Sequence, residues 1–187
     1  MRKTLLAVAL LTLAFTVQPM SAQQKADPPK ATPSSSQIVL GQWNDIGRKL
    51  TAMAEDFPED KYDFKPTPEM RTFAEQMLHA ANAMNFFTTV ALGQKLPAEE
   101  NPSRSQYKTK ADVVAFVKKC VEEGASAIKS KGDKGMSEWM TEPFSKQQMH
   151  VSDLAYSLIE HSGEHYGQMV VYYRISGLVP PESRPKK

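Results

Sequence analysis

The sequence predicts an all-α protein, a four-helix bundle with long connections between its helices. Apolar residues recur at helical spacing in four separate stretches of the chain. Segments rich in proline or glycine divide these stretches. No stretch of useful length alternates apolar and polar residues as a half-buried strand would, and neither a glycine-rich dinucleotide motif nor a P-loop occurs.

The composition is that of a globular protein, and it argues against a dedicated nucleic-acid binder. Hydrophobic residues make up 41% of the 187 residues and charged residues 24%. The formal net charge is only +2, whereas nucleic-acid-binding domains usually carry a basic patch or stripe. The single cysteine, Cys120, cannot form an internal disulfide and falls in an apolar helical pattern. We interpret it as a small core residue; a catalytic thiol is the alternative.

Residues 1–22 have the pattern of a secretory signal peptide. Arg2 and Lys3 precede an apolar run over residues 5–17, which is short for a membrane span. Cleavage is expected after Ala22, and no cysteine near that point could carry a lipid anchor. The sequence therefore predicts an exported protein, periplasmic or secreted, with no membrane contact after cleavage. An uncleaved membrane anchor is the alternative.

The folded domain is expected to span residues 36–181. A flexible leader over residues 23–35, rich in proline, serine and lysine, should precede it. The first helix is predicted from Ser36 to Asp56. Prolines in the segment that follows exclude a continuous helix, and we expect a structured loop anchored by the aromatic side chains Tyr62 and Phe64.

The second helix is predicted to begin at a capping box, with Thr72 at the N-cap and Glu75 three residues later. It should end near Leu92, since Gly93 suits the position just past a helix end. His79 lies at the edge of the apolar row of this helix. By itself, a histidine there is more typical of a packed or half-exposed residue than of a metal ligand.

The third helix is predicted from Thr109 to about Lys129, and glycines in residues 131–144 predict a loop after it. Aromatic and methionine side chains in that loop should fold back as a lid on one end of the bundle. His150, near the start of the last helix, is interpreted as a surface or capping residue. The side chains expected in the lid are those of Trp139, Met140 and Phe144.

The last helix, over residues 153–177, places two histidines in its apolar stripe. His161 and His165 are four residues apart and therefore lie one turn apart on the same face. A buried imidazole is unfavourable unless it is hydrogen-bonded or bound to something. Such a pair can close on one divalent ion, at roughly 2.0–2.1 Å per Zn–N bond. Two satisfied core histidines are the alternative.

Gly163 and Gly167 interrupt this helix on the side away from the histidines. Each interior glycine costs about 1 kcal/mol relative to alanine. Close approach of another backbone would explain the two glycines, and a homodimer could form through this face. Gly177 should end the helix, and residues 182–187 should form a loose tail.

Two blocks of the sequence resemble the DinB-like superfamily, whose fold is a four-helix bundle. The blocks are FPEDKYDFKPTPEMRTFAEQMLHAANAMNFF and LIEHSGEHYGQMVVYYRISGLVPP. The resemblance implies a metal triad of one histidine from the second helix and an HxxxH pair from the fourth. Carried over by position, these are His79, His161 and His165, and all three are intact.

Three imidazoles would leave a coordination position open, as in a catalytic rather than a structural metal site. The ligands suit zinc, nickel, iron or copper, so the sequence does not identify the divalent metal. Each ligand should donate its other N–H to a neighbour. Gln76 and Gln168, each one turn from a ligand, are candidates for this role, although residues in such positions are more often plain polar rim residues.

A rival motif is present, because residues 161–165 also spell H-x-x-E-H, an inverted zinc-peptidase pattern with Glu164 as general base. The short chain after His165 leaves little room for its downstream ligand. The DinB-like resemblance instead implies hydrolysis, or transfer of a thiol to an electrophilic small molecule. The alternatives are a bundle that binds a metal or small ligand without turnover, and a structural domain with a vestigial, metal-free triad.

Overall fold

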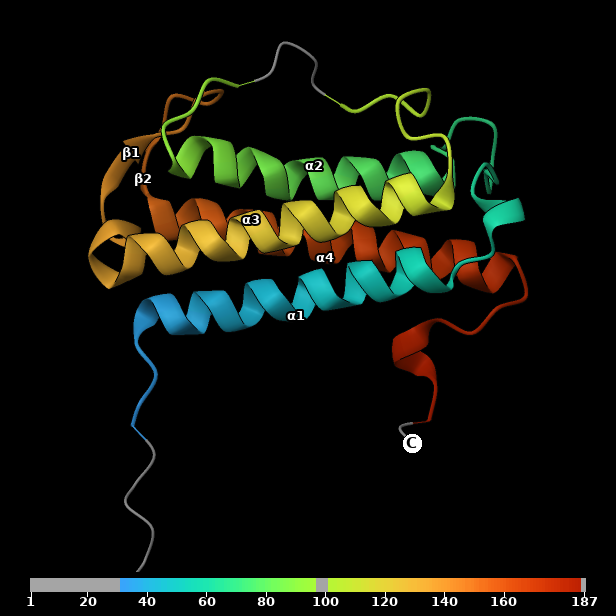
Figure 1. The fold of residues 1–187 in the computed structure, drawn as a ribbon, viewed down its shortest axis with the longest axis horizontal. Helices are drawn as coiled ribbons and strands as arrows, with labels where there is room; N and C mark the ends of the chain where they lie inside the picture. Colours follow the sequence, from blue (N-terminus) through green and yellow to red (C-terminus); the bar gives the residue numbers. More distant parts are fainter. Residues whose placement is uncertain (1–30, 97–100, 186–187) are drawn as a thin grey trace, which may run out of the picture. The chain divides into compact units, whose positions relative to one another are not determined.

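The computed structural model of the chain describes residues 31–96 and 101–185, and these form a helical bundle (Figure 1). The all-α, four-helix prediction is confirmed. The predicted signal peptide and most of the predicted leader lie outside the described residues. The helices are α1 (Ser35–Asp56), α2 (Phe73–Ala91), α3 (Lys110–Met136) and α4 (Val151–Ile175), with two short 3-10 turns, η1 (Glu59–Lys61) and η2 (Pro181–Ser183), and two strands, β1 (Trp139–Thr141) and β2 (Gln148–His150).

Two pairs of parallel helices make up the bundle. Helices α1 and α4 run in one direction, and α2 and α3 run in the other (Figure 1). Helix α1 packs on α3 and α4, and α2 packs on the same two helices, so α1 and α2 are diagonal to each other. Because α2 and α3 are parallel neighbours, the chain must return along the bundle between them. The antiparallel seam between α2 and α4 carries all three predicted metal ligands.

The start of α2 is held by the predicted capping box and by a hydrogen bond to the preceding loop. Thr72 Oγ1 accepts from the Glu75 N–H at 3.1 Å, and Glu75 Oε2 accepts from the Thr72 N–H at 2.8 Å. The Tyr62 carbonyl accepts from the N–H of Ala74 at 2.9 Å, so the preceding loop satisfies a donor that lacks a helical acceptor. Tyr62 itself is fully buried and donates its hydroxyl to a carbonyl of α1. This anchoring sets the position of α2 relative to α1.

Helices α1 and α3 approach closely at two glycines. A Cβ atom at Gly124 would lie 2.0 Å from Cζ2 of Trp43, and one at Gly47 would lie 2.4 Å from Cγ1 of Val121. Trp43 is fully buried and donates its indole N–H to the Val121 carbonyl at 3.0 Å. The absence of a side chain at Gly124 therefore makes room for the indole ring.

The close approach expected at Gly163 and Gly167 does not occur within the described chain. A Cβ atom at either position would have no neighbouring atom within 4 Å. Gly167 is exposed and Gly163 is half-buried. That expectation was therefore wrong for packing inside this chain.

The segment between α3 and α4 differs from the predicted loop. Helix α3 continues beyond Lys129 to Met136 across a kink at Gly132, whose φ of 55° is in the left-handed region that glycine tolerates. Strands β1 and β2 then form an antiparallel hairpin in which Trp139 faces His150. Strands of three residues are too short to produce a recognisable alternation in the sequence.

The residues after α4 fold back on α1 instead of starting a loose tail. Glu182 in η2 accepts from the Arg48 guanidinium at 2.6 Å. The Arg184 guanidinium donates to both carboxylate oxygens of Asp56, at 2.7 and 2.5 Å. Among the described helices, none is long and apolar enough to cross a membrane.

Candidate metal centre

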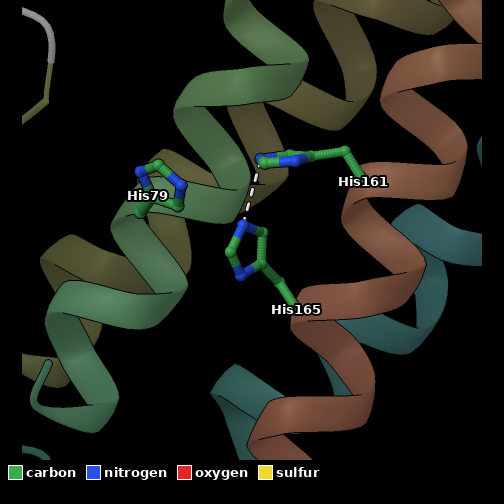
Figure 2. Close-up of side chains that lie close together, drawn as sticks. All are labelled: His79, His161 and His165. Atoms are coloured by element: carbon green, nitrogen blue, oxygen red, sulfur yellow. Dashed lines mark hydrogen bonds between the residues drawn. The ribbon is translucent and has the colours of Figure 1, made fainter. Parts of the chain in front are cut away.

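The three predicted ligands lie together where α2 faces α4. His79 projects from α2, and His161 and His165 project from successive turns of α4 toward it (Figure 2). Each ring offers one nitrogen, and these three nitrogens all lie within 4.8 Å of one another. The antiparallel pairing of the two helices brings His79 level with the histidine pair. The fourth histidine, His150, lies at the start of α4, where its ring packs against Trp139, and it is outside the cluster, as expected.

The spacing of the histidine pair on α4 fits a shared divalent ion, whereas His79 lies farther away. Nε2 of His161 and Nε2 of His165 are 3.0 Å apart. Two nitrogens bound to one ion at roughly 2.0–2.1 Å, at tetrahedral or right angles to each other, are about 2.8–3.4 Å apart. The His79 ring centre lies 4.7 Å from that of His165 and 5.6 Å from that of His161. A shared ion would draw the His79 ring further toward α4.

The outward-facing nitrogens of two rings have oxygen acceptors. Nδ1 of His165 is 3.2 Å from Oε1 of Gln168, and the Gln76 amide contacts the same nitrogen and donates to that oxygen. Nδ1 of His79 is 2.7 Å from Oδ1 of Asn101. The Asn101 oxygen can only accept, so it holds a proton on Nδ1 of His79 and leaves the Nε2 lone pair of that ring free to bind a metal. Nδ1 of His165 is contacted both by an acceptor, Gln168 Oε1, and by a donor, the Gln76 amide.

Gln76 and Gln168 were proposed from the sequence as hydrogen-bond partners of the metal ligands. Gln76 and Gln168 both contact Nδ1 of His165, Gln168 through its amide oxygen and Gln76 through its amide nitrogen. Only the Gln168 oxygen can accept a ring N–H, as the metal interpretation requires. Asn101 was missed, because it lies in a polar connection with no helical period that would align it with His79. No signal in the sequence of that connection singles it out.

Burial keeps the histidine pair neutral. Desolvation, followed by the charge of the neighbouring His161, lowers the pKa of His165 to about 4. The pKa of His161 is also lowered, first by burial and then by the charge of His79. A metal ligand must be a neutral imidazole, so these rings are in the required state at neutral pH.

A pocket of about 240 Å³ adjoins the cluster. His79 and His161 form part of its wall, whereas the more deeply buried His165 does not line it. Glu164 is exposed and does not line it either. Because the third histidine precedes the pair, on α2, the arrangement does not match the inverted peptidase motif, whose third ligand follows it. The remaining lining residues are Asn82, Ala83, Asn85, Phe86, Leu96, Asn101, Phe144 and Leu158.

Cys120 is not part of any reactive site. Its side chain is 1% exposed in the core, on α3. Burial raises the pKa of the thiol to about 12, so it is protonated at neutral pH. The interpretation of Cys120 as a small core residue is confirmed.

Comparison with known proteins decides the family. The sequence profile of the DinB superfamily matches residues 42–169. The chain belongs to the DinB superfamily. The match spans most of the described domain, including all three clustered histidines, and it confirms the resemblance seen in the sequence. No curated protein sequence matches the chain.

Solved structures share the fold of this DinB protein. YfiT from Bacillus subtilis, a probable metal-dependent hydrolase with an unusual four-helix bundle topology, has 15% identity and a TM-score of 0.61, covering 81% of this chain and 94% of its own. A DinB-like protein from B. subtilis, YjoA, has 15% identity and a TM-score of 0.60, with 80% and 99% covered. A DinB-like protein from Bacillus cereus has 20% identity and a TM-score of 0.59, with 76% and 93% covered.

Proposed function

We propose that this DinB protein is a metal-dependent hydrolase of a small molecule, with His79, His161 and His165 as ligands of one divalent ion. The observation that carries the proposal is the convergence of three imidazole nitrogens within 4.8 Å. Its similarity in fold to YfiT, a probable metal-dependent hydrolase, favours the same class of reaction. The ligand set suits zinc, nickel or iron.

Neighbouring residues would orient the three imidazole rings and keep the histidine pair neutral. Asn101 accepts from Nδ1 of His79, and Gln76 and Gln168 contact Nδ1 of His165, so both rings are held in a defined orientation. Burial keeps the histidine pair neutral before any ion binds. A divalent ion bound there would supply Lewis acidity and activate water for attack on the substrate.

One observation favours a second function, binding without turnover. Among the described residues that line the pocket there is no aspartate, glutamate, lysine or arginine to act as acid or base. A metal- or ligand-binding bundle needs none. Thiol transfer is a further candidate reaction, in which the ion would hold a thiolate. Assays for hydrolysis and for thiol addition, run with and without the metal, separate these functions.

The metal itself is tested by elemental analysis of protein purified without a histidine tag. We expect stoichiometric metal in the wild type and in His150→Ala, a histidine removed outside the cluster. We expect loss of the metal in His165→Ala. Absence of metal from the wild type, together with an unchanged melting temperature when zinc or nickel is added, would refute the proposal.

We also propose that the protein acts outside the cytoplasm. The proposal is supported by the charged and apolar segments of residues 1–22, which are typical of a cleaved signal peptide. Fractionation of the producing cells, with mass spectrometry of the mature N-terminus, tests it. A full-length chain in the cytoplasmic fraction would contradict export.

A further inference from the structure

The pocket beside the histidines differs in character from a typical polar catalytic cleft. We call it the aromatic pocket. Its apolar wall is formed by Ala83, Phe86, Leu96, Phe144 and Leu158. Phe86 of α2 and Phe144 of the hairpin stack with their ring centres 5.3 Å apart and their planes 22° apart. His79 and His161 close the side of the pocket that faces the metal cluster.

We propose that the aromatic pocket binds the uncharged, ring-bearing part of the substrate and directs its reacting group toward His79 and His161. This inference rests on the proposed metal-dependent function, and it names the class of substrate.

The lining explains why the bound group should be uncharged. The described residues around the pocket carry no formal charge apart from the titratable imidazoles, and their polar groups are the amides of three asparagines. A charged group moved from water into apolar surroundings loses its hydration, and none of the described lining residues apart from the imidazoles could form an ion pair with it. A neutral ring loses little on entering and gains contact with the Phe86 and Phe144 rings.

The volume sets the size of that ring-bearing group. A cavity of about 150 Å³ lined by apolar side chains is large enough for benzene. The aromatic pocket, at about 240 Å³, therefore has room for one ring with a substituent. A larger polycyclic group would extend into solvent.

The hairpin holds Phe144 at the pocket although its ring is 72% exposed. The carboxylate of Glu142, which is nearly buried, accepts from the backbone N–H of Phe144 at 3.0 Å and from that of Ser145. The Glu142 N–H in turn donates to the Gln147 carbonyl at 2.9 Å, which closes the turn. The exposed ring is thus carried by a fixed backbone and completes the pocket wall, as expected for a residue that determines specificity.

The test is a ¹⁹F NMR titration of the purified protein with two probes of similar size. One is the neutral ketone 4-fluoroacetophenone, and the other is the anion 4-fluorobenzoate. Ala83→Phe fills the pocket from α2, and Phe144→Ala removes its outer wall. Trp139→Ala is the matched control, because Trp139 is an exposed aromatic residue of the same hairpin that does not line the pocket.

We expect the wild type and Trp139→Ala to bind the ketone equally. His165→Ala, which should hold no ion, should bind the ketone at least about tenfold more tightly than the benzoate. Phe144→Ala should weaken ketone binding about two- to tenfold, the effect of losing one aromatic contact. Ala83→Phe should weaken it by more than tenfold. No ketone binding, equal binding of the benzoate, or equal losses in Phe144→Ala and Trp139→Ala would overturn the inference, and the last comparison holds even if Ala83→Phe fails to fold.

The two probes are compared in His165→Ala, because an ion held by His79 and His161, which line the pocket, would attract the carboxylate of the benzoate. His165 itself does not line the pocket. His165→Ala should therefore bind the ketone as the wild type does. A protein that binds metal but not the ketone refutes this inference and leaves the metal function standing. A protein that binds the ketone but holds no metal refutes the proposed function.

Discussion

Replacing Gly124 with alanine should destabilise the bundle, although alanine is the better helix former. The new Cβ would lie 2.0 Å from Cζ2 and 2.6 Å from Cε2 of Trp43. The indole ring cannot move away freely, since it is fully buried and packs on Phe87 at 4.9 Å between ring centres. Its movement would also stretch the 3.0 Å hydrogen bond to the Val121 carbonyl.

The magnitude follows from three opposing effects. Overpacking of a core typically costs about 1–3 kcal/mol, and a weakened buried hydrogen bond adds about 1 kcal/mol. Removing a glycine from a helix interior returns about 1 kcal/mol. The net loss should be about 1–3 kcal/mol, which lowers the melting temperature of a domain of this size by about 2–12 °C.

Thermal unfolding followed by circular dichroism measures this change. Gly41→Ala is the matched control, because a Cβ there has no atom within 4 Å and the glycine lies within helix α1. The control should raise the free energy of unfolding by up to about 1 kcal/mol. If Gly124→Ala melts at or above the wild-type temperature, the packing of α3 against Trp43 described above is incorrect.

Three further predictions concern the site, the core thiol and the end of the chain. Gln168→Leu should weaken metal affinity about 10- to 100-fold, with the helical circular dichroism unchanged, because His165 loses a polar contact that orients its ring. Competition with a zinc chelator measures the affinity, and an unchanged affinity would contradict this role of Gln168. Cys120 should resist a thiol reagent such as DTNB in the native protein and react only on unfolding, because burial raises its pKa to about 12; rapid native labelling would contradict its burial. Hydrogen bonds from Arg184 lower the pKa of Asp56 below its ordinary value of 3.8. The ion pair therefore stabilises the folded protein fully above pH 3.8, and this stabilisation is lost as the pH falls through the pKa of the folded state. Arg184→Ala should therefore be less stable than the wild type at pH 6 and differ less from it near pH 3, in urea unfolding at both pH values; a difference that does not change with pH would count against this pairing.

The local signals in the sequence predicted the helices well. The capping box at Thr72 and Glu75 gave the start of α2, because both of its hydrogen bonds join residues close in sequence. The apolar stripe and the spacing of His161 and His165 likewise placed both rings on one face of α4. Such features depend on helical geometry, which a single segment determines alone.

Features that depend on contacts between segments were harder to predict. Periodicity left His79 as a packed residue, and only the family resemblance joined it to the pair on α4. The predicted site of close helix packing was also wrong, since a neighbouring side chain lies close to Gly124 and not to Gly163. A glycine in a helix has the same sequence signature whether a neighbouring indole or open space lies beside it.

The single histidine on α2 and the histidine pair on α4 lie far apart in the sequence. His79 and His161 are 82 positions apart, and α3 and the hairpin intervene between their helices. A partly folded chain could offer an ion only the adjacent pair on α4, so tight capture requires the complete bundle. The ion would then link α2 to α4. It would raise the free energy of unfolding by about 2.7 kcal/mol when its free concentration is 100 times the dissociation constant. Removal of the proposed ion by a chelator should accordingly lower the free energy of unfolding, and tight uptake of the ion during refolding should require α2 and α4 to be paired.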